Sequence, residues 1–154
     1  MNIRQAKTAD LPELVLLFVA LLDYLKEQNQ ALDYAQDRDK LIGGAMETLR
    51  GKMVTRGHVV IVAEEDGKVK GFCAGCLVSL PSFHEHTLIG SCEWAYPMNP
   101  PIVRPLMEGF EKWSVYHGAA GVQGYTPAGS LSERVMLRHK MQALFTTYFK
   151  SYKE

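Results

Sequence analysis

The chain has 154 residues, of which 47% are apolar and 22% are charged. This length fits one domain, and the composition is that of a globular protein rather than a disordered one. Lysine plus arginine and aspartate plus glutamate both total 17, so the formal net charge is zero. This balance argues against a protein whose main partner is nucleic acid or an anionic membrane.

The three cysteines are an odd number, which does not fit a disulfide framework. The first residues lack the basic region, apolar core and cleavage site of a signal peptide. The most apolar run, residues 14–22, is about half as long as a membrane span. We therefore expect a soluble, cytoplasmic protein.

The first predicted elements are a strand over residues 3–6 and a helix that reaches about residue 25. Asp10 and Glu13 predict a capping box at the start of this helix, with Pro12 in its first turn. Nearly every side of the helix is apolar, which predicts burial on one side and contact with a partner on another.

A second helix is expected after residue 37 and is predicted to end at Gly51. Its apolar face has helical spacing and consists of Leu41, Ile42, Ala45, Met46 and Leu49. Residues 59–63 and 69–80 then predict a hairpin with its turn at residues 65–68. After a further turn, residues 88–96 form the next predicted strand.

The second half continues with a helix from about residue 103, which Gly118 ends, and a strand over residues 122–125. A capping box formed by Ser130 and Glu133 opens a short helix towards Lys140, and residues 143–149 form a closing strand. The order β-α-α-β-β-β-α-β-α-β predicts an α/β fold: one sheet of mixed direction with helices on both faces.

This order of elements resembles the GCN5-related N-acetyltransferase (GNAT) family, and several segments strengthen the likeness. The opening IRQAKTADL at residues 3–11 is similar to the family's first strand and capped helix. The segment AEEDGKVKGF at residues 63–72 is similar to its A-x-x-D-G-x-x-V-G hairpin, and EWAYP at residues 93–97 lies where the fourth strand ends at a proline. FEKWS at residues 110–114, four residues before Gly118, is similar to a helix that ends W-A-x-x-x-G.

The likeness covers essentially the whole chain, and among GNAT branches it is greatest to short proteins encoded in tailed-phage genomes. It implies that acetyl-CoA is the acyl donor and an amine the acceptor. Pantetheine would then lie between the strand that ends at Pro97 and the strand near residues 122–123. The implied contacts on the first of these strands are Trp94, Ala95 and Tyr96.

The segment that binds pyrophosphate in the family departs from its pattern. Family members use R/Q-x-x-G-x-G/A at the start of the third helix, where backbone N–H groups approach the phosphates. The matching residues 98–105, MNPPIVRP, contain no glycine, and their prolines contribute no N–H. Arg104 can still bind a phosphate from the first helical turn. Val103 and Arg104 are therefore the expected cofactor contacts here.

The candidate general base is Glu93. Alternation along its strand predicts that Glu93, Ser91 and Ala95 share one face, with Leu88, Cys92, Trp94 and Tyr96 on the other. A glutamate on this strand often accepts the proton of the attacking amine in GNAT enzymes, and strand N–H groups polarise the thioester carbonyl. Alternatively, Glu93 pairs with a lysine or arginine, or faces solvent.

The candidate general acid is His139. The family's L-Y-x-x-x-G-F pattern matches residues 137–143, which hold neither that tyrosine nor the Gly-Phe pair. His139 can transfer a proton at neutral pH in place of the tyrosine.

Two further motifs have ordinary structural interpretations. His84 and His86 have the spacing of a two-histidine metal fragment, but a polar turn explains them without a third ligand, and we expect no metal site. Cys73 and Cys76 are three residues apart in a strand, so their sulfurs are expected on opposite faces as small core cysteines.

The first functional hypothesis is an N-acetyltransferase that uses acetyl-CoA on a small-molecule or protein amine and forms a homodimer, with no nucleic-acid or membrane partner. The second is a GNAT-fold binding or assembly module that has lost catalysis, as the glycine-free loop suggests. The third is a member that uses another acyl donor or modifies a nucleotide.

Overall fold

The computed structural model describes residues 1–28, 37–81, 86–125, 131–138 and 140–141. A 3₁₀ turn, Thr8–Asp10, follows the first strand. Along these residues the elements are β1 (Asn2–Gln5), α1 (Leu11–Gln28), α2 (Arg38–Val54), β2 (His58–Glu65), β3 (Lys68–Pro81), β4 (His86–Tyr96), α3 (Pro100–Tyr116), β5 (Gly121–Gly124) and α4 (Leu131–Arg138). This order confirms the predicted mixed α/β fold as far as α4. The predicted closing strand, residues 143–149, lies outside the described residues.

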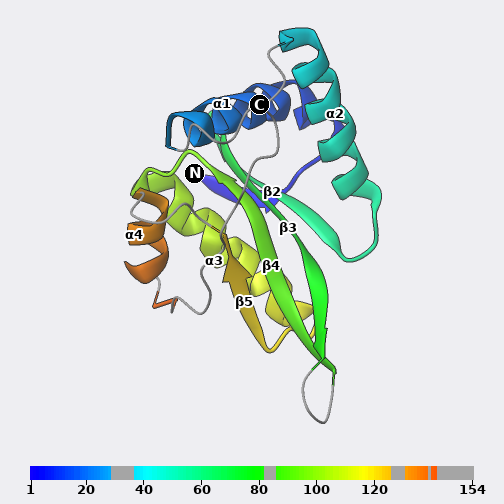
Figure 1. Ribbon diagram of the computed structural model, residues 1–154, viewed down its shortest axis with the longest axis vertical. Helices are drawn as coiled ribbons and strands as arrows, with labels where there is room; N and C mark the ends of the chain where they lie inside the picture. The colour runs from blue at the N-terminus through cyan, green and yellow to red at the C-terminus, as the bar shows by residue number, and fades with distance from the viewer. Residues whose placement is uncertain (29–36, 82–85, 126–130, 139, 142–154) are drawn as a thin grey trace, which may run out of the picture.

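Within the described residues the strands form one sheet in the order β1-β2-β3-β4-β5 (Figure 1). Strands β1 to β4 are antiparallel neighbours, and β5 is parallel to β4. Parallel neighbours need a crossover connection, which α3 supplies. The predicted hairpin is confirmed as β2 and β3, joined by Asp66 and Gly67.

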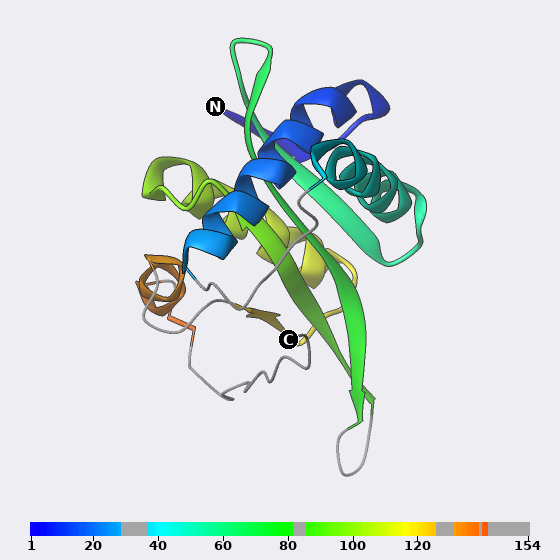
Figure 2. The ribbon, with the colours of Figure 1, turned by 45° about the horizontal axis from the view of Figure 1, so that its top comes forward.

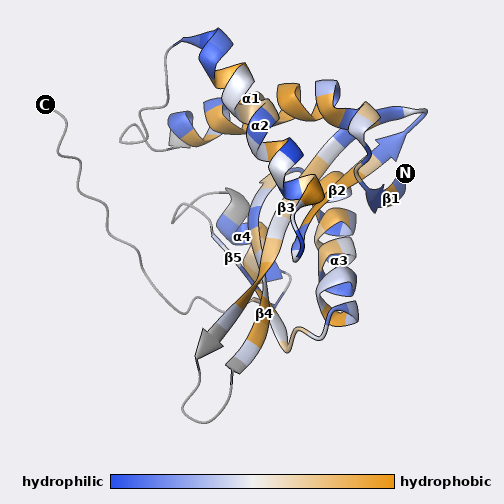
Figure 3. Ribbon diagram, turned by 90° about the vertical axis from the view of Figure 1, so that its right-hand side faces the viewer, coloured by the Kyte–Doolittle hydropathy of each residue, from blue (hydrophilic) through white to orange (hydrophobic). Residues whose placement is uncertain are grey.

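Helices cover both faces of the sheet. Helices α1 and α2 pack on one face and α3 on the other (Figure 3). Figure 2 looks nearly along α2, with α1 lying across the strands beside it. The predicted apolar face of α2 is confirmed: Ala45 and Leu49 are buried, and Leu41, Ile42 and Met46 pack against the same core.

The α1 helix is buried along most of its length, although Leu16 is exposed. Contact of its outer side with a partner stays a prediction. None of the described helices is long and apolar enough to cross a membrane.

Two strand glycines let α3 lie close to the sheet. A Cβ atom at Gly75 of β3 would clash with the Ser91 backbone oxygen of β4 and would lie 2.8 Å from Cε2 of Phe110, and one at Gly90 of β4 would clash with Oγ of Ser114. Glycine weakens a strand interior and often marks close approach of another segment. These two positions therefore set the depth at which α3 packs.

The predicted capping box at the start of α1 is wrong. Asp10 accepts a hydrogen bond from the Lys7 backbone N–H (2.6 Å) and pairs with Arg4 of β1 (2.7 Å). Glu13 accepts from the backbone N–H of Val69 in β3 (2.6 Å). Both carboxylates thus bind groups outside α1. The Lys7 bond is a local cap of the preceding 3₁₀ turn, whereas local spacing does not reveal Arg4 and Val69 as partners.

The predicted end of α2 at Gly51 is also wrong, because the helix continues to Val54. The backbone N–H and the hydroxyl of Thr55 both donate to the Gly51 carbonyl, at 3.0 and 2.7 Å. These bonds satisfy a carbonyl of the last turn without a glycine cap.

Candidate functional site

Strand β4 contains a β-bulge at Glu93. Ala74 of β3 pairs with Trp94, but Gly75 pairs with Cys92, so Glu93 is an extra residue in the ladder. An extra residue interrupts the alternation of side chains. Glu93 and Trp94 therefore both lie on the α1/α2 face, whereas Cys92 and Ala95 pack towards α3.

The predicted alternation, with Glu93 and Ala95 opposite Cys92, Trp94 and Tyr96, is thus wrong. A period of two holds only along an uninterrupted strand, and the bulge shifts it by one. The consequence is favourable for a site, because Glu93 shares its face with the aromatic ring of Trp94.

Glu93 has two side-chain partners in this position. One carboxylate oxygen pairs with Nζ of Lys52, from the last turn of α2, and the other accepts a hydrogen bond from the Cys76 thiol (3.3 Å). The Lys52 ammonium also lies 4.7 Å from the centroid of the Trp94 ring. Of the alternatives considered for Glu93, pairing with a lysine is therefore the one that the structure shows.

The ion pair leaves Glu93 within reach of a solute. The Lys52 side chain is 11% exposed and that of Glu93 is 30% exposed. A half-buried carboxylate beside an aromatic ring and a cation can bind an amine and accept a proton from it. Pairing with Lys52 is thus compatible with a role as general base.

The two cysteines of β3 confirm the prediction that their sulfurs diverge. The Cys73 thiol donates to the Leu106 carbonyl on the α3 face (3.5 Å), whereas Cys76 faces Glu93. Both are buried and free. Burial and the nearby Glu93 carboxylate raise the pKa of the Cys76 thiol. Cys76 is therefore a neutral hydrogen-bond donor to Glu93 and a poor nucleophile at neutral pH.

The side chains of Trp94, Ala95 and Tyr96 belong to the core. The Trp94 ring meets the Phe18 ring edge-on, with 4.9 Å between centroids, and Ala95 is buried towards α3. The pairing of β4 with β5 ends at Cys92 and Gly124 within the described residues. Among the described residues, β4 therefore has no β5 partner from Glu93 to Tyr96. The backbone of these residues can contact a ligand.

The N-terminus of α3 offers few free N–H groups. Pro100 and Pro101 have none, and the N–H groups of Ile102 and Val103 both donate to the Asn99 carbonyl, at 3.1 and 2.9 Å. The Val103 side chain is buried, whereas Arg104 is exposed and pairs with Glu108 (3.1 Å). Binding of an anion at this helix end therefore depends on side chains.

A groove of about 440 Å³ brings Val103 and Arg104 together with α4. Sequence reasoning missed two cations that line it, Arg138 and Lys140. The complete lining is Pro100, Val103, Arg104, Glu108, Glu111, Val135, Arg138 and Lys140. Three basic side chains around one groove can hold a phosphate-bearing ligand where backbone donors are lacking.

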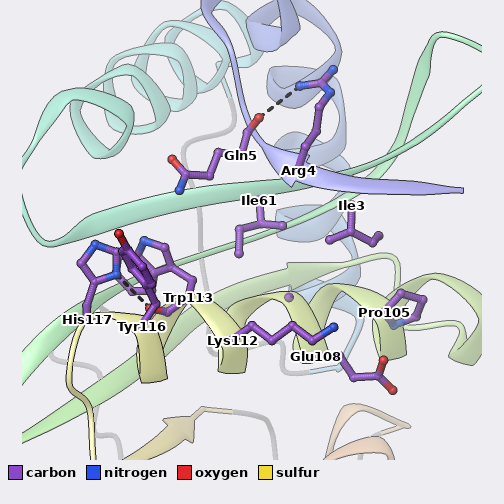
Figure 4. A pocket seen from close by; sticks show the side chains of 11 residues that line it. Ile3, Arg4, Gln5, Ile61, Pro105, Glu108, Lys112, Trp113, Tyr116 and His117 are labelled. Atoms are coloured by element: carbon purple, nitrogen blue, oxygen red, sulfur yellow. Dashed lines mark hydrogen bonds between the residues drawn. The ribbon is translucent and has the colours of Figure 1, made fainter.

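A second cavity, of about 450 Å³, lies between β1 and α3 (Figure 4). Trp113, Tyr116 and His117 form its aromatic wall, with Ile3 and Ile61 on the sheet side. Glu93 and the predicted cofactor contacts do not line it. This cavity is therefore separate from the candidate catalytic residue and the predicted cofactor contacts.

Lys52 is a site residue that sequence reasoning missed, although the sequence contains a signal for it. Lys52 lies three residues after Leu49 on the apolar face of α2, where a lysine needs a partner. The other predicted groups, His139 and His84, lie outside the described residues. The side chain of His86 does too. The described residues contain no group of three or more potential metal ligands from His, Cys, Asp and Glu.

Comparison with known proteins shows similarity in structure without similarity in sequence. No protein-family model and no curated protein sequence matches the chain. A variant of the BH1408 protein from Bacillus halodurans superposes with a TM-score of 0.84 at 12% identity, covering 99% of this chain and 100% of the other.

Two aminoglycoside acetyltransferases are also similar. AAC(6')-Iy, solved in complex with CoA, gives a TM-score of 0.74 at 13% identity and covers 99% of this chain and 94% of the other. AAC(6')-IG from Acinetobacter haemolyticus gives 0.73 at 15% identity and covers 100% and 99%. At these identities the likeness concerns the fold. The chain therefore has the fold of the GNAT acetyltransferases, as its sequence predicted.

Proposed function

We propose that the chain is an N-acetyltransferase that transfers an acetyl group from acetyl-CoA to an amine. The observation that carries the proposal is the bulge at Glu93, where a partly exposed carboxylate lies on the same face as Trp94 and, within the described residues, the pairing of β4 with β5 ends. A candidate base and a segment of β4 without a described β5 partner thus lie at the same point of the chain. The similarity to an acetyltransferase solved with CoA supports the choice of donor.

In the proposed reaction the amine nitrogen attacks the thioester carbonyl carbon. Glu93 accepts the amine proton, directly or through one water, and backbone N–H groups of β4 polarise the carbonyl oxygen. The C–N bond forms, the C–S bond breaks, and the CoA thiolate leaves. His139 is proposed to protonate that thiolate.

The donor's phosphates are proposed to lie at the groove of Arg104, Arg138 and Lys140. The glycine loop of the family is absent, and the first N–H groups of α3 are missing or already bonded to Asn99. Side-chain cations carry this part of binding, so we expect the affinity to fall with added salt.

The occupied N–H groups of α3 also favour a second candidate, a binding module that does not take acetyl-CoA. Calorimetric titration with acetyl-CoA, and with CoA as control, separates the two. The transferase predicts binding at about micromolar Kd. No binding up to millimolar concentration supports the module and turns the search towards protein partners.

Two variants locate the phosphate contact. Arg104→Ala should weaken acetyl-CoA binding by about 10-fold, the loss of one charge-assisted contact. Pro101→Ala supplies an N–H at the second helical position and should strengthen binding. Arg50→Ala, on α2, is the matched control. Equal affinities in all three variants would place the phosphates elsewhere.

A further inference from the structure

Lys52 has hydrogen-bonding capacity that its known contacts do not use. An ammonium carries three N–H donors. One faces Glu93, and the Trp94 ring lies beside the group without accepting a conventional hydrogen bond. The described residues offer it no other hydrogen-bond or ion-pair partner, although its side chain is only 11% exposed. Lys52 is therefore a largely buried cation that can bind at least one more acceptor atom.

The charge at the site follows from the same contacts. Lys52 balances Glu93, and the Cys76 thiol is neutral, so these groups sum to zero. A polycationic acceptor gains no net attraction here. Its ammonium, placed at Glu93, would also lie next to the Lys52 ammonium, and like charges at this distance repel. An acceptor that also carries a negative charge avoids this conflict.

We infer that Lys52 selects acceptors with a carboxylate beside the amine, in the manner of an α-amino acid. The inference rests on the proposed function, which places the acceptor amine at Glu93. Lys52 and Glu93 are in direct contact, so the positive and negative groups of the site are as close as the two charges of an amino acid. The acceptor carboxylate binds the free donor of Lys52 while its amine reaches Glu93.

The experiment compares amino acids with the amines that result from their decarboxylation. Alanine with ethylamine, phenylalanine with 2-phenylethylamine, and histidine with histamine differ only in the carboxylate. We expect the wild-type chain to prefer the amino acid by about 10- to 100-fold in kcat/KM, the range of a charge-assisted hydrogen bond.

Variants assign the preference to Lys52. Lys52→Met should abolish the preference for amino acids, and Lys52→Arg should keep most of it. Lys40→Met is the matched control, because Lys40 lies on the same helix but is 80% exposed and pairs with Asp37. A purely structural ion pair predicts a lower Tm in Lys52→Met with no change in relative preference.

Calorimetric binding of the same compounds, with CoA present, separates this inference from the proposed function. Lys52-dependent binding of amino acids without acetylation supports the inference and contradicts the transferase. The inference is overturned if each amino acid and its decarboxylated amine have equal kcat/KM, or if the amine has the higher value, even where acetylation occurs. Absence of binding by any amino acid overturns it too. If Lys52→Met does not fold, the wild-type panel tests the preference for the carboxylate and Lys52→Arg tests its assignment to Lys52.

Discussion

Two clusters of charged side chains lie on the α1/α2 face of the sheet, and they are built differently. In the first, Arg4 donates to both carboxylate oxygens of Asp10, at 2.7 and 2.9 Å, and to Glu64 at 2.7 Å. In the second, one lysine meets one carboxylate, with a thiol and an aromatic ring beside them.

Exposure does not distinguish the clusters, because the side chains of Glu64 and Glu93 are 27% and 30% exposed. Saturation does. The planar guanidinium of Arg4 spreads its donors over two carboxylates, and the contact lowers the pKa of Asp10. Lys52 has N–H donors without a partner among the described residues. The proposed function assigns catalysis to the Lys52–Glu93 cluster, and we predict that the Arg4 cluster is only structural.

The largest expected effect is on turnover. Glu93→Gln should lower kcat by about 10²- to 10⁴-fold, because an amide cannot accept the amine proton. Steady-state rates give the loss, and thermal denaturation should show that the variant still folds. Glu64→Gln, in the saturated cluster, is the matched control and should leave kcat unchanged. An unaltered rate in Glu93→Gln would remove Glu93 from the mechanism.

The next effect is on stability. Asp10→Asn should cost about 1–3 kcal/mol in the free energy of unfolding, because Arg4 loses an ionised partner that is largely buried. Denaturant titration measures this cost. The rate of acetyl transfer should not change, and a loss of activity in the folded variant would contradict the division between the clusters.

The smallest effect is a dependence of that cost on pH. The Arg4 contact and the Lys7 N–H hold the pKa of Asp10 below its ordinary value of 3.8. The unfolded chain therefore binds a proton at Asp10 more readily than the folded chain. The stabilisation is fully present above pH 3.8 and is lost as the pH falls through the lowered folded-state pKa. Wild type and Asp10→Asn should thus converge in stability in acid, and a gap that persists would refute this origin.

Local periodicity predicted those parts of the fold that local interactions determine. The β2–β3 hairpin, the apolar face of α2 and the opposite orientation of Cys73 and Cys76 all follow from spacing alone. The capping box failed because Asp10 and Glu13 bind groups of β3 and of the N-terminal segment. Asp10 caps the preceding 3₁₀ turn instead, and the spacing of residues 10–13 gives no sign of the Glu13–Val69 contact.

The candidate site was predictable only in part. Sequence reasoning selected Glu93 by its residue type and strand position, but the bulge depends on the register between β3 and β4. Lys52 is 41 residues away in sequence, and only the fold brings it to Glu93. Arg138 and Lys140 likewise reach the α3 groove through packing of α4. Long-range register and helix placement are therefore what a single sequence leaves undetermined.

The glycines beneath α3 have a consequence for how this chain can vary. Gly75 and Gly90 make room for Phe110 and Ser114, and the same helix positions Arg104 at its other end. An added methyl group at Gly90 would press on α3, and one at Gly75 would press on both α3 and the backbone of β4 at Ser91. Either change would shift α3 and the proposed phosphate contact with it. In a saturation mutagenesis library these strand positions should rank among the least tolerant. Substitution of Gly75 or Gly90 should therefore weaken phosphate binding, although neither residue contacts the phosphate.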